Sequence, residues 1–122
     1  MACVLVVEDD GDIREMLAVF LEFEGYEVMT ATNGLEALAV MRERRPCLVL
    51  LDLMMPVLTG WDFRRRQLAD PAIADVPVIA VTAMSDPQEI ARELNLRGLG
   101  KPIGLDEIAR EVAAVCHHRP IS

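Results

Sequence analysis

The chain has 122 residues and a formal net charge of −8 at pH 7. This length allows one folded domain over residues 1–122, and the negative charge disfavours direct binding to nucleic acid or to an anionic membrane surface. Hydrophobic residues make up 52% of the sequence, yet no apolar run is long enough to cross a membrane and no signal-peptide pattern is present. We therefore expect a cytoplasmic globular protein with no direct contact to nucleic acid and no membrane insertion.

The cysteines Cys3, Cys47 and Cys116 stand far apart and lack the close spacing typical of a metal site. Two of them lie in or beside strongly apolar segments. We expect small buried thiols in a reducing compartment, and no disulfide framework. His117 and His118 follow Cys116 directly, but consecutive helical residues point about 100° apart, so we expect a solvated chain end there and no metal site.

Short apolar runs that are typical of buried strands alternate with runs that have helical spacing. The first strand is predicted over 4–7. It precedes a helix that Asp12 caps and Gly25 ends. The inner face of this helix is expected at Ile13, Met16, Leu17, Phe20 and Leu21.

A second strand is predicted over 26–31, and a helix that Asn33 opens follows it. The inner face of that helix is expected at Leu35, Leu38 and Met41. The third strand, 47–51, is a continuous apolar run, which is typical of a parallel strand buried on both faces. A weakly marked helix is predicted over 60–69.

Within the 60–69 helix, the apolar face is expected at Trp61, Phe63 and Leu68, and the run Arg64–Arg66 is most simply a solvated face. The fourth strand is predicted over 76–81. Ser85 is expected to cap the next helix, with Pro87 in its first turn and Ile90, Ala91 and Leu94 inside. A short strand over 97–100 and a last helix from Leu105 to Val115 complete the pattern.

Five strand–helix units in this order predict an α/β fold with a doubly wound parallel sheet. We expect five strands in the order 2-1-3-4-5 and five helices, which is the flavodoxin-like arrangement. In this order the strands 4–7 and 47–51 are neighbours. Ligands of such sheets bind in the crevice at the carboxyl ends of the strands, where the strand order reverses.

Acidic side chains follow both of these central strands. Glu8 and Asp9 come directly after the first, and Asp52 comes after the third. Carboxylates that pack together repel one another unless a cation lies between them, and Mg²⁺ prefers oxygen ligands. We expect Asp9 and Asp52 to bind Mg²⁺ or Mn²⁺ directly, Glu8 to reach it through water, and the backbone carbonyl of Met54 to complete the site.

Two further strand ends bring polar groups to the same edge. Thr82 closes the fourth strand with a hydroxyl, and Lys101 follows the fifth with an ammonium group. Acids, hydroxyl and ammonium around one carboxylate suit phosphoryl transfer, which depends on positioning and charge neutralisation. Asp52 is the expected nucleophile, because carboxylates form acyl phosphates in such reactions.

Four stretches in register, 4–10, 52–60, 78–83 and Lys101-Pro102, resemble the receiver domain of two-component response regulators, of the stand-alone type. The resemblance runs from about Val4 to Val115. It implies that Asp52 accepts a phosphoryl group from the phosphohistidine of a sensor kinase or phosphotransfer protein.

The resemblance also assigns the other residues and a partner surface. Glu8, Asp9 and the Met54 carbonyl hold Mg²⁺ beside Asp52, and Thr82 and Lys101 contact the phosphoryl group. A downstream protein is expected on the face formed by the fourth helix, the fifth strand and the fifth helix. Phosphorylation then redistributes two existing states of that face.

This sequence departs from the family pattern at some positions. Gly98 stands where the family usually has an aromatic switch residue, Ile103 stands where a phenylalanine is common, and Arg64 and Gln67 occupy helix positions that are normally apolar. Gly98 motivates an alternative, a receiver-like docking module whose phosphorylation is uncoupled from output. A hydrolase is a third reading, but Met54 stands where such phosphatases have a second acid, so we expect no conventional turnover enzyme.

Overall fold

The computed structural model describes residues 2–53, 57–83, 86–100 and 104–116. A parallel sheet forms its centre, with the strand order β2-β1-β3-β4-β5 that the sequence predicts. The strands are β1 (Cys3–Val7), β2 (Glu27–Ala31), β3 (Leu48–Asp52), β4 (Val78–Thr82) and β5 (Arg97–Gly100). The helices are α1 (Gly11–Phe23), α2 (Gly34–Glu43), α3 (Gly60–Leu68), α4 (Pro87–Leu94) and α5 (Leu105–Cys116).

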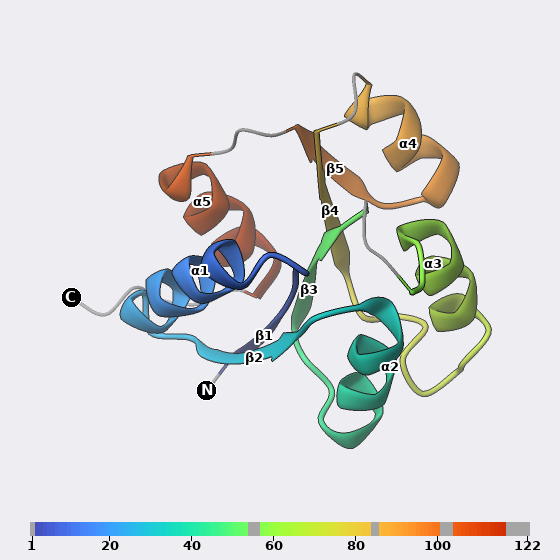
Figure 1. Cartoon of the computed structure of the whole chain (residues 1–122), viewed down its shortest axis with the longest axis horizontal. Helices are drawn as coiled ribbons and strands as arrows, with labels where there is room; N and C mark the ends of the chain where they lie inside the picture. The colour runs from blue at the N-terminus through green and yellow to red at the C-terminus, as the bar shows by residue number, and fades with distance from the viewer. Residues whose placement is uncertain (1, 54–56, 84–85, 101–103, 117–122) are drawn as a thin grey trace.

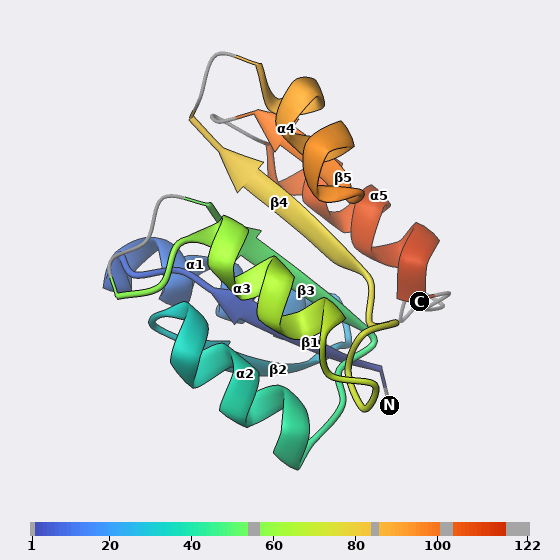
Figure 2. The ribbon, with the colours of Figure 1, turned by 90° about the vertical axis from the view of Figure 1, so that its right-hand side faces the viewer.

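Helices cover both faces of the sheet (Figure 1). One face carries α2, α3 and α4, which lie toward the viewer in Figure 2, and the other carries α1 and α5. Each strand is followed by a helix, and neighbouring strands pair in parallel. The doubly wound fold is thereby confirmed, and all carboxyl ends of the strands lie at one edge.

Strand side chains alternate between the two faces, because successive residues of a strand point in opposite directions. Two buried clusters result. On the α2–α3–α4 face the strands contribute Leu5, Val7, Val49, Leu51, Val78 and Ala80. On the α1–α5 face they contribute Val4, Val6, Leu48, Leu50, Ile79 and Leu99.

The start of α1 differs from the prediction. Asp10, not Asp12, is the cap, and its carboxylate accepts hydrogen bonds from the amides of Asp12 at 2.9 Å and Ile13 at 3.1 Å. A capping side chain must precede the free amides by two or three residues, and Asp10 does so. Asp12 lies in the first turn instead, where its charge complements the helix dipole. The end is close to the predicted one, with Gly25 at a positive φ of 98° just beyond it.

The predicted cap of α2 is confirmed, and the predicted cap of α4 is corrected. Asn33 caps α2 as predicted, and its side chain accepts a hydrogen bond from the amide of Glu36 at 2.9 Å. Asp86 caps α4 and accepts from the amide of Glu89 at 3.0 Å. The predicted cap, Ser85, lies outside the described residues.

Some predicted inner positions are not buried. Met16 on α1 is 49% exposed, Leu35 on α2 is 45% exposed and Leu68 on α3 is 49% exposed. In α1 the predicted face holds one fully buried residue, Leu21, while Ile13, Leu17 and Phe20 are half-buried. Helical spacing therefore locates the correct side of α1, but the neighbouring elements cover that side incompletely.

Arg64 is the opposite case, because the predicted solvated face of α3 carries a buried cation. Arg64 is buried, whereas Arg65 and Arg66 are exposed. Its guanidinium donates from Nε to the carbonyl of Leu94 at 3.1 Å and from Nη2 to the carbonyl of Asn95 at 2.8 Å. The charge therefore lies against the carboxyl end of α4, where the helix dipole favours a cation. Burial lowers the pKa of the Arg64 guanidinium.

Gln67 extends this buried network toward β4. Its Oε1 accepts a hydrogen bond from Nη1 of Arg64 at 2.7 Å. Its Nε2 donates to the carbonyls of Ile73 at 3.0 Å and Val76 at 2.9 Å. The polar positions that depart from the family pattern thus supply hydrogen-bond donors to backbone carbonyls at the end of α4 and in the segment before β4.

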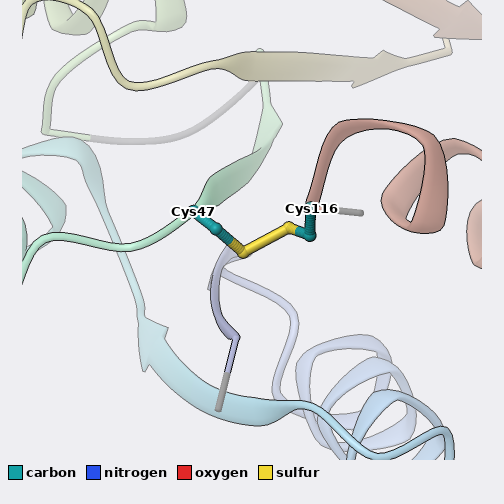
Figure 3. Close-up of a disulfide and its surroundings, with 2 residues drawn as sticks. All are labelled: Cys47 and Cys116. Carbon is teal, nitrogen blue, oxygen red and sulfur yellow. A yellow bond between two sulfur atoms is a disulfide. The ribbon is translucent and has the colours of Figure 1, made fainter. Parts of the chain in front are cut away.

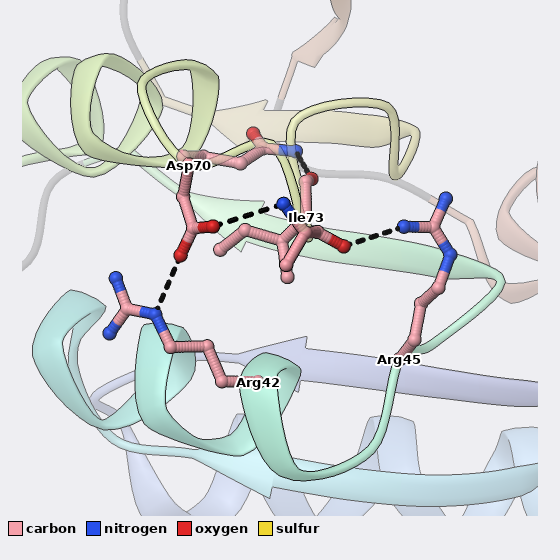
Figure 4. Close-up of polar contacts among 6 residues, drawn as sticks. Arg42, Arg45, Asp70 and Ile73 are labelled. Carbon is pink, nitrogen blue, oxygen red and sulfur yellow. Dashed lines mark hydrogen bonds and ion pairs between the residues drawn. The ribbon is translucent and has the colours of Figure 1, made fainter.

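Ion pairs fasten α2 to the segment between α3 and β4 (Figure 4). Arg42 pairs through Nε with Asp70 at 2.8 Å, and Asp70 also accepts a hydrogen bond from the amide of Ala72 at 3.0 Å. Arg45 donates to the carbonyl of Ala72 at 3.0 Å and pairs with Asp75 at 2.6 Å. The arginines at the end of α2 therefore have specific partners.

The expectation of unpaired thiols is wrong for two cysteines. Cys47 and Cys116 form a disulfide across 69 residues of sequence, with 5.7 Å between their Cα atoms (Figure 3). Cys47 directly precedes β3 and Cys116 ends α5, so the fold brings together residues that sequence spacing does not relate. Cys3 remains a free and buried cysteine, as predicted.

Candidate functional site

Three acidic side chains meet at the carboxyl edge of the sheet. Glu8 directly follows β1, Asp52 ends β3, and these strands are hydrogen-bonded neighbours. Carboxylate oxygens of Glu8, Asp9 and Asp52 all lie within 4.8 Å of one another. The structure thus brings together the acids that the sequence predicts.

Burial differs among these acids. Glu8 and Asp52 are buried, at 4% and 8% exposure, and Asp9 is exposed. The amide of Glu8 donates to the carbonyl of Ala31 at 3.1 Å, which continues the β1–β2 pairing past the last strand residue. Glu8 is therefore fixed at its backbone, and Asp9 lies on the open side of the cluster.

Arg14 holds the acidic loop from the first turns of α1, and sequence reasoning missed it. Its Nη1 donates to the carbonyl of Glu8 at 2.9 Å and to that of Asp9 at 3.4 Å. These bonds fix the backbone of the loop that carries Glu8 and Asp9. The available signal was a basic residue near the amino end of a helix, where the dipole disfavours it and another interaction must compensate.

Thr82 is fully buried at the end of β4. Asp52 pairs in register with Val81, and Thr82 pairs with Gly100, so the hydroxyl-bearing residue lies one position beyond the neighbour of Asp52. Lys101 directly follows Gly100 in the sequence. Lys101 and Met54 lie outside the described residues, and their assignments stay predictions.

An apolar cavity of about 460 Å³ adjoins the acids, and no sequence pattern indicates it. It lies between the sheet, α1 and α5, and Glu8 and Asp52 are its acidic lining residues. Its apolar lining includes Ile13, Leu17, Leu50, Val81 and Ile108. Ile13, Met16 and Leu17 of α1 form one wall of this cavity.

Gly98, at the position of the family's aromatic, lies against the first turn of α4. A Cβ atom added there would lie 2.5 Å from the carbonyl oxygen of Pro87 and 3.0 Å from Cβ of Ala91. Gln88 also donates to the carbonyl of Gly98 at 3.1 Å. Glycine thus allows direct contact between α4 and β5, and a larger side chain would require α4 to shift.

The donor set fits a hard divalent cation. Carboxylate oxygens are the ligands that Mg²⁺ and Mn²⁺ prefer, and clustered carboxylates gain from a cation that offsets their mutual repulsion. The buried pair Glu8 and Asp52, together with the exposed Asp9, allows protein ligands on one side and open positions on the other. The described part of the cluster is therefore suited to phosphoryl chemistry at one carboxylate.

Comparison with known proteins identifies the class of this fold and site. The family model of the response regulator receiver domain matches residues 4–113. The chain therefore belongs to the response regulator receiver family, as its sequence motifs indicate.

Individual relatives agree with this assignment. The phosphate regulon transcriptional regulatory protein PhoB of Pseudomonas aeruginosa is 36% identical over 115 residues, which cover 92% of this chain and 50% of that protein. The chemotaxis protein CheY4 of Vibrio cholerae has a TM-score of 0.85 and 31% identity, with 94% of this chain and 98% of that chain covered.

A third relative bears on the metal. The receiver domain of the sensor histidine kinase PA1611 of Pseudomonas aeruginosa has a TM-score of 0.83 and 28% identity, covers 96% of this chain and 98% of its own, and holds a magnesium ion in its active site cleft. The chain spans about half the length of PhoB and about a third of other curated relatives. Among the helices that the structure describes, none has the length and apolar character needed to cross a membrane.

Proposed function

We propose that this chain is a phosphoacceptor in a two-component phosphorelay, with Asp52 as the residue that becomes phosphorylated. The observation that carries the proposal is the cluster of Glu8, Asp9 and Asp52, whose carboxylate oxygens lie within 4.8 Å of one another at the carboxyl edge of the sheet. The donor is a phosphohistidine of a sensor histidine kinase or of a phosphotransfer protein. The protein acts in the cytoplasm and is not a conventional turnover enzyme.

The reaction moves one phosphoryl group between two side chains. An oxygen of Asp52 forms the new bond to phosphorus, the bond to the donor histidine nitrogen breaks, and the bonding electrons remain on the imidazole. A bound Mg²⁺ or Mn²⁺ supplies positive charge for the phosphoryl oxygens. Glu8, Asp9, Asp52 and the Met54 carbonyl are the proposed ligands of that ion.

The remaining site residues position the transferred group. Thr82 donates its hydroxyl to a phosphoryl oxygen, and Lys101 pairs with another through its ammonium group. Arg14 keeps the loop that carries Glu8 and Asp9 in place through its bonds to their carbonyls. Phosphorylation then changes the face formed by α4, β5 and α5, to which a downstream protein binds.

Intact-mass spectrometry tests the proposal. The chain is incubated with acetyl phosphate and Mg²⁺, and we expect one added phosphoryl group. Asp52→Asn should show no adduct, while Asp106→Asn, which changes an exposed acid of α5, should behave as the unmodified chain. Removing the metal with a chelator should also prevent the adduct.

An adduct on Asp52→Asn would disprove the assignment of the phosphoacceptor. An adduct that forms equally well in the presence of chelator would disprove the metal requirement. If no adduct forms, binding of beryllofluoride distinguishes rapid hydrolysis from a site that is not phosphorylated, and the absence of binding would overturn the proposal.

A further inference from the structure

The Cys47–Cys116 disulfide lies at the edge of the sheet opposite the acidic cluster. Cys47 precedes β3 at its amino end, whereas Asp52 closes the same strand at its carboxyl end. A strand of this length extends about 16 Å. The disulfide and the candidate phosphorylation site are therefore separate features of the molecule that share one strand.

The cysteines differ in their accessibility. Cys47 and Cys116 are half-buried at the surface, whereas Cys3 is buried. Burial also raises the pKa of the Cys3 thiol, which keeps it protonated and poorly reactive. The Cys47–Cys116 pair is therefore more open to a dissolved thiol or disulfide than Cys3 is.

The domain does not belong to the class that needs a disulfide in order to fold. Its sheet has all five strands paired and carries a buried cluster on each face. Small domains that depend on disulfides are those whose core is too small, which does not describe this chain. The bond therefore serves a more local purpose.

That local purpose concerns the last turn of α5. Within this helix, which the structure describes in full, the buried residues are Ile108 and Val112. The following residues are half-buried or exposed, and Cys116 is the last of them. The disulfide thus fastens the end of α5 to the start of β3 beyond the last fully buried residue of the helix, where the side chains pack only partly against the buried cluster.

We propose that Cys47 and Cys116 form a reversible thiol–disulfide site that controls how firmly α5 is held to the sheet. The co-reactant is a low-molecular-weight disulfide and its thiol. On oxidation, one cysteine thiolate attacks that disulfide and displaces one thiol. The second cysteine thiolate then displaces the other thiol, so that two cysteines are oxidised as one disulfide is reduced. On reduction the same steps run backward and the last turn of α5 loses its covalent attachment.

The proposed site is tested on the full chain equilibrated with glutathione mixtures that range from oxidised to reduced. Free thiols are alkylated in the native state and mapped by mass spectrometry. We expect Cys47 and Cys116 to become alkylated together as the mixture becomes reducing, while Cys3 reacts only after denaturation. A disulfide that resists reduction until the chain unfolds, or one that joins Cys3 to Cys47, would overturn the proposal.

Hydrogen exchange shows whether the bond holds α5. Amides of residues 113–116 should exchange about tenfold faster in the reduced chain, because local opening of a helix end requires less free energy than global unfolding. Cys116→Ser and Cys47→Ser should show the fast exchange under both conditions, and Cys3→Ser should respond as the unmodified chain does. Equal exchange in the oxidised and reduced chains would overturn the proposal.

Phosphorylation by acetyl phosphate is measured on the same samples and separates this inference from the proposed function. The Asp52 adduct should form to the same extent in oxidised and reduced protein, because the disulfide lies at the far end of β3. A failure to form the adduct in both samples would count against the phosphoacceptor and would leave the thiol result unaffected.

Discussion

The two faces of the sheet are held in different ways. On the α2–α3–α4 face, helices contribute fully buried side chains such as Phe63 and Met41, and the Arg64–Gln67 network satisfies buried carbonyls. On the α1–α5 face, a cavity of about 460 Å³ separates parts of the helices from the sheet, and a disulfide fastens the end of α5. Apolar packing and this buried network hold the first face, whereas on the second face a disulfide adds a covalent attachment at the end of α5, away from the cavity.

This difference between the two faces is consistent with the proposed phosphorylation of Asp52. The acidic cluster and the cavity share Glu8 and Asp52, so the looser face adjoins the site where charge changes. Elements that move in a switch come from the less stable parts of a fold. The denser face supplies a rigid support for β3, the strand that Asp52 closes.

Truncation of Phe63 should give the largest loss of stability. Phe63 is fully buried on the dense face, so Phe63→Ala removes a whole ring from a packed core and should lower the free energy of unfolding by about 3–5 kcal/mol. Leu17→Ala on the cavity wall should cost only about 1–2 kcal/mol, because that side chain is half-buried. Urea denaturation followed by circular dichroism measures both, and equal losses would contradict the contrast between the faces.

Loss of the disulfide should give the next largest effect. The bond closes a long loop, so Cys116→Ser should lower the free energy of unfolding of the oxidised chain by about 2–4 kcal/mol. Cys3→Ala is the matched control and should change it by less than about 1.5 kcal/mol. If a reducing agent leaves the denaturation midpoint of the unmodified chain unchanged, the disulfide does not stabilise the fold.

The sequence predicts the parts of this molecule that follow from local pattern. The predicted strand over 47–51 is the buried strand β3 shifted by one residue, to Leu48–Asp52. The acids that follow β1 and end β3 meet, and Ile90, Ala91 and Leu94 are buried, as predicted. These outcomes depend on the spacing of residues within one helix or strand, and on a strand order that is one of the few compatible with five strand–helix units.

The parts that the sequence does not predict depend on contacts between distant elements. Cys47 and Cys116 meet only because α5 ends beside the start of β3. The sequence around Arg64 is typical of a solvated helix face, and Arg64 is buried because the carboxyl end of α4 packs against it. The cavity is equally hidden, because helical spacing cannot show how closely α1 approaches the sheet.

Removal of the buried cation should cost less than the loss of the disulfide. Arg64→Met keeps a long apolar side chain but leaves carbonyls of Leu94 and Asn95 without their donors, which should lower the free energy of unfolding by about 1–3 kcal/mol. The neighbouring exposed change Arg66→Met should alter it by less than about 0.5 kcal/mol. A stable Arg64→Met protein would mean that desolvation of the guanidinium outweighs its hydrogen bonds.

The smallest expected effect concerns the pH dependence of the dense face. The hydrogen bond from Arg42, with a second from the amide of Ala72, lowers the pKa of the Asp70 carboxyl below its ordinary value. A lowered folded-state pKa stabilises the fold above the ordinary value near 3.8, and this contribution is lost as the pH falls through the folded-state pKa. Arg42→Met should therefore raise the pKa of Asp70 toward the ordinary value and make stability less sensitive to acid. An NMR titration of the Asp70 carboxyl measures the pKa, and Arg45→Met is the control, since Arg45 acts on the pKa of Asp75 instead. If Arg42→Met left the Asp70 titration unchanged, the ion pair would not hold α2 to the segment before β4, and the dense face would depend on apolar packing and the Arg64 network alone.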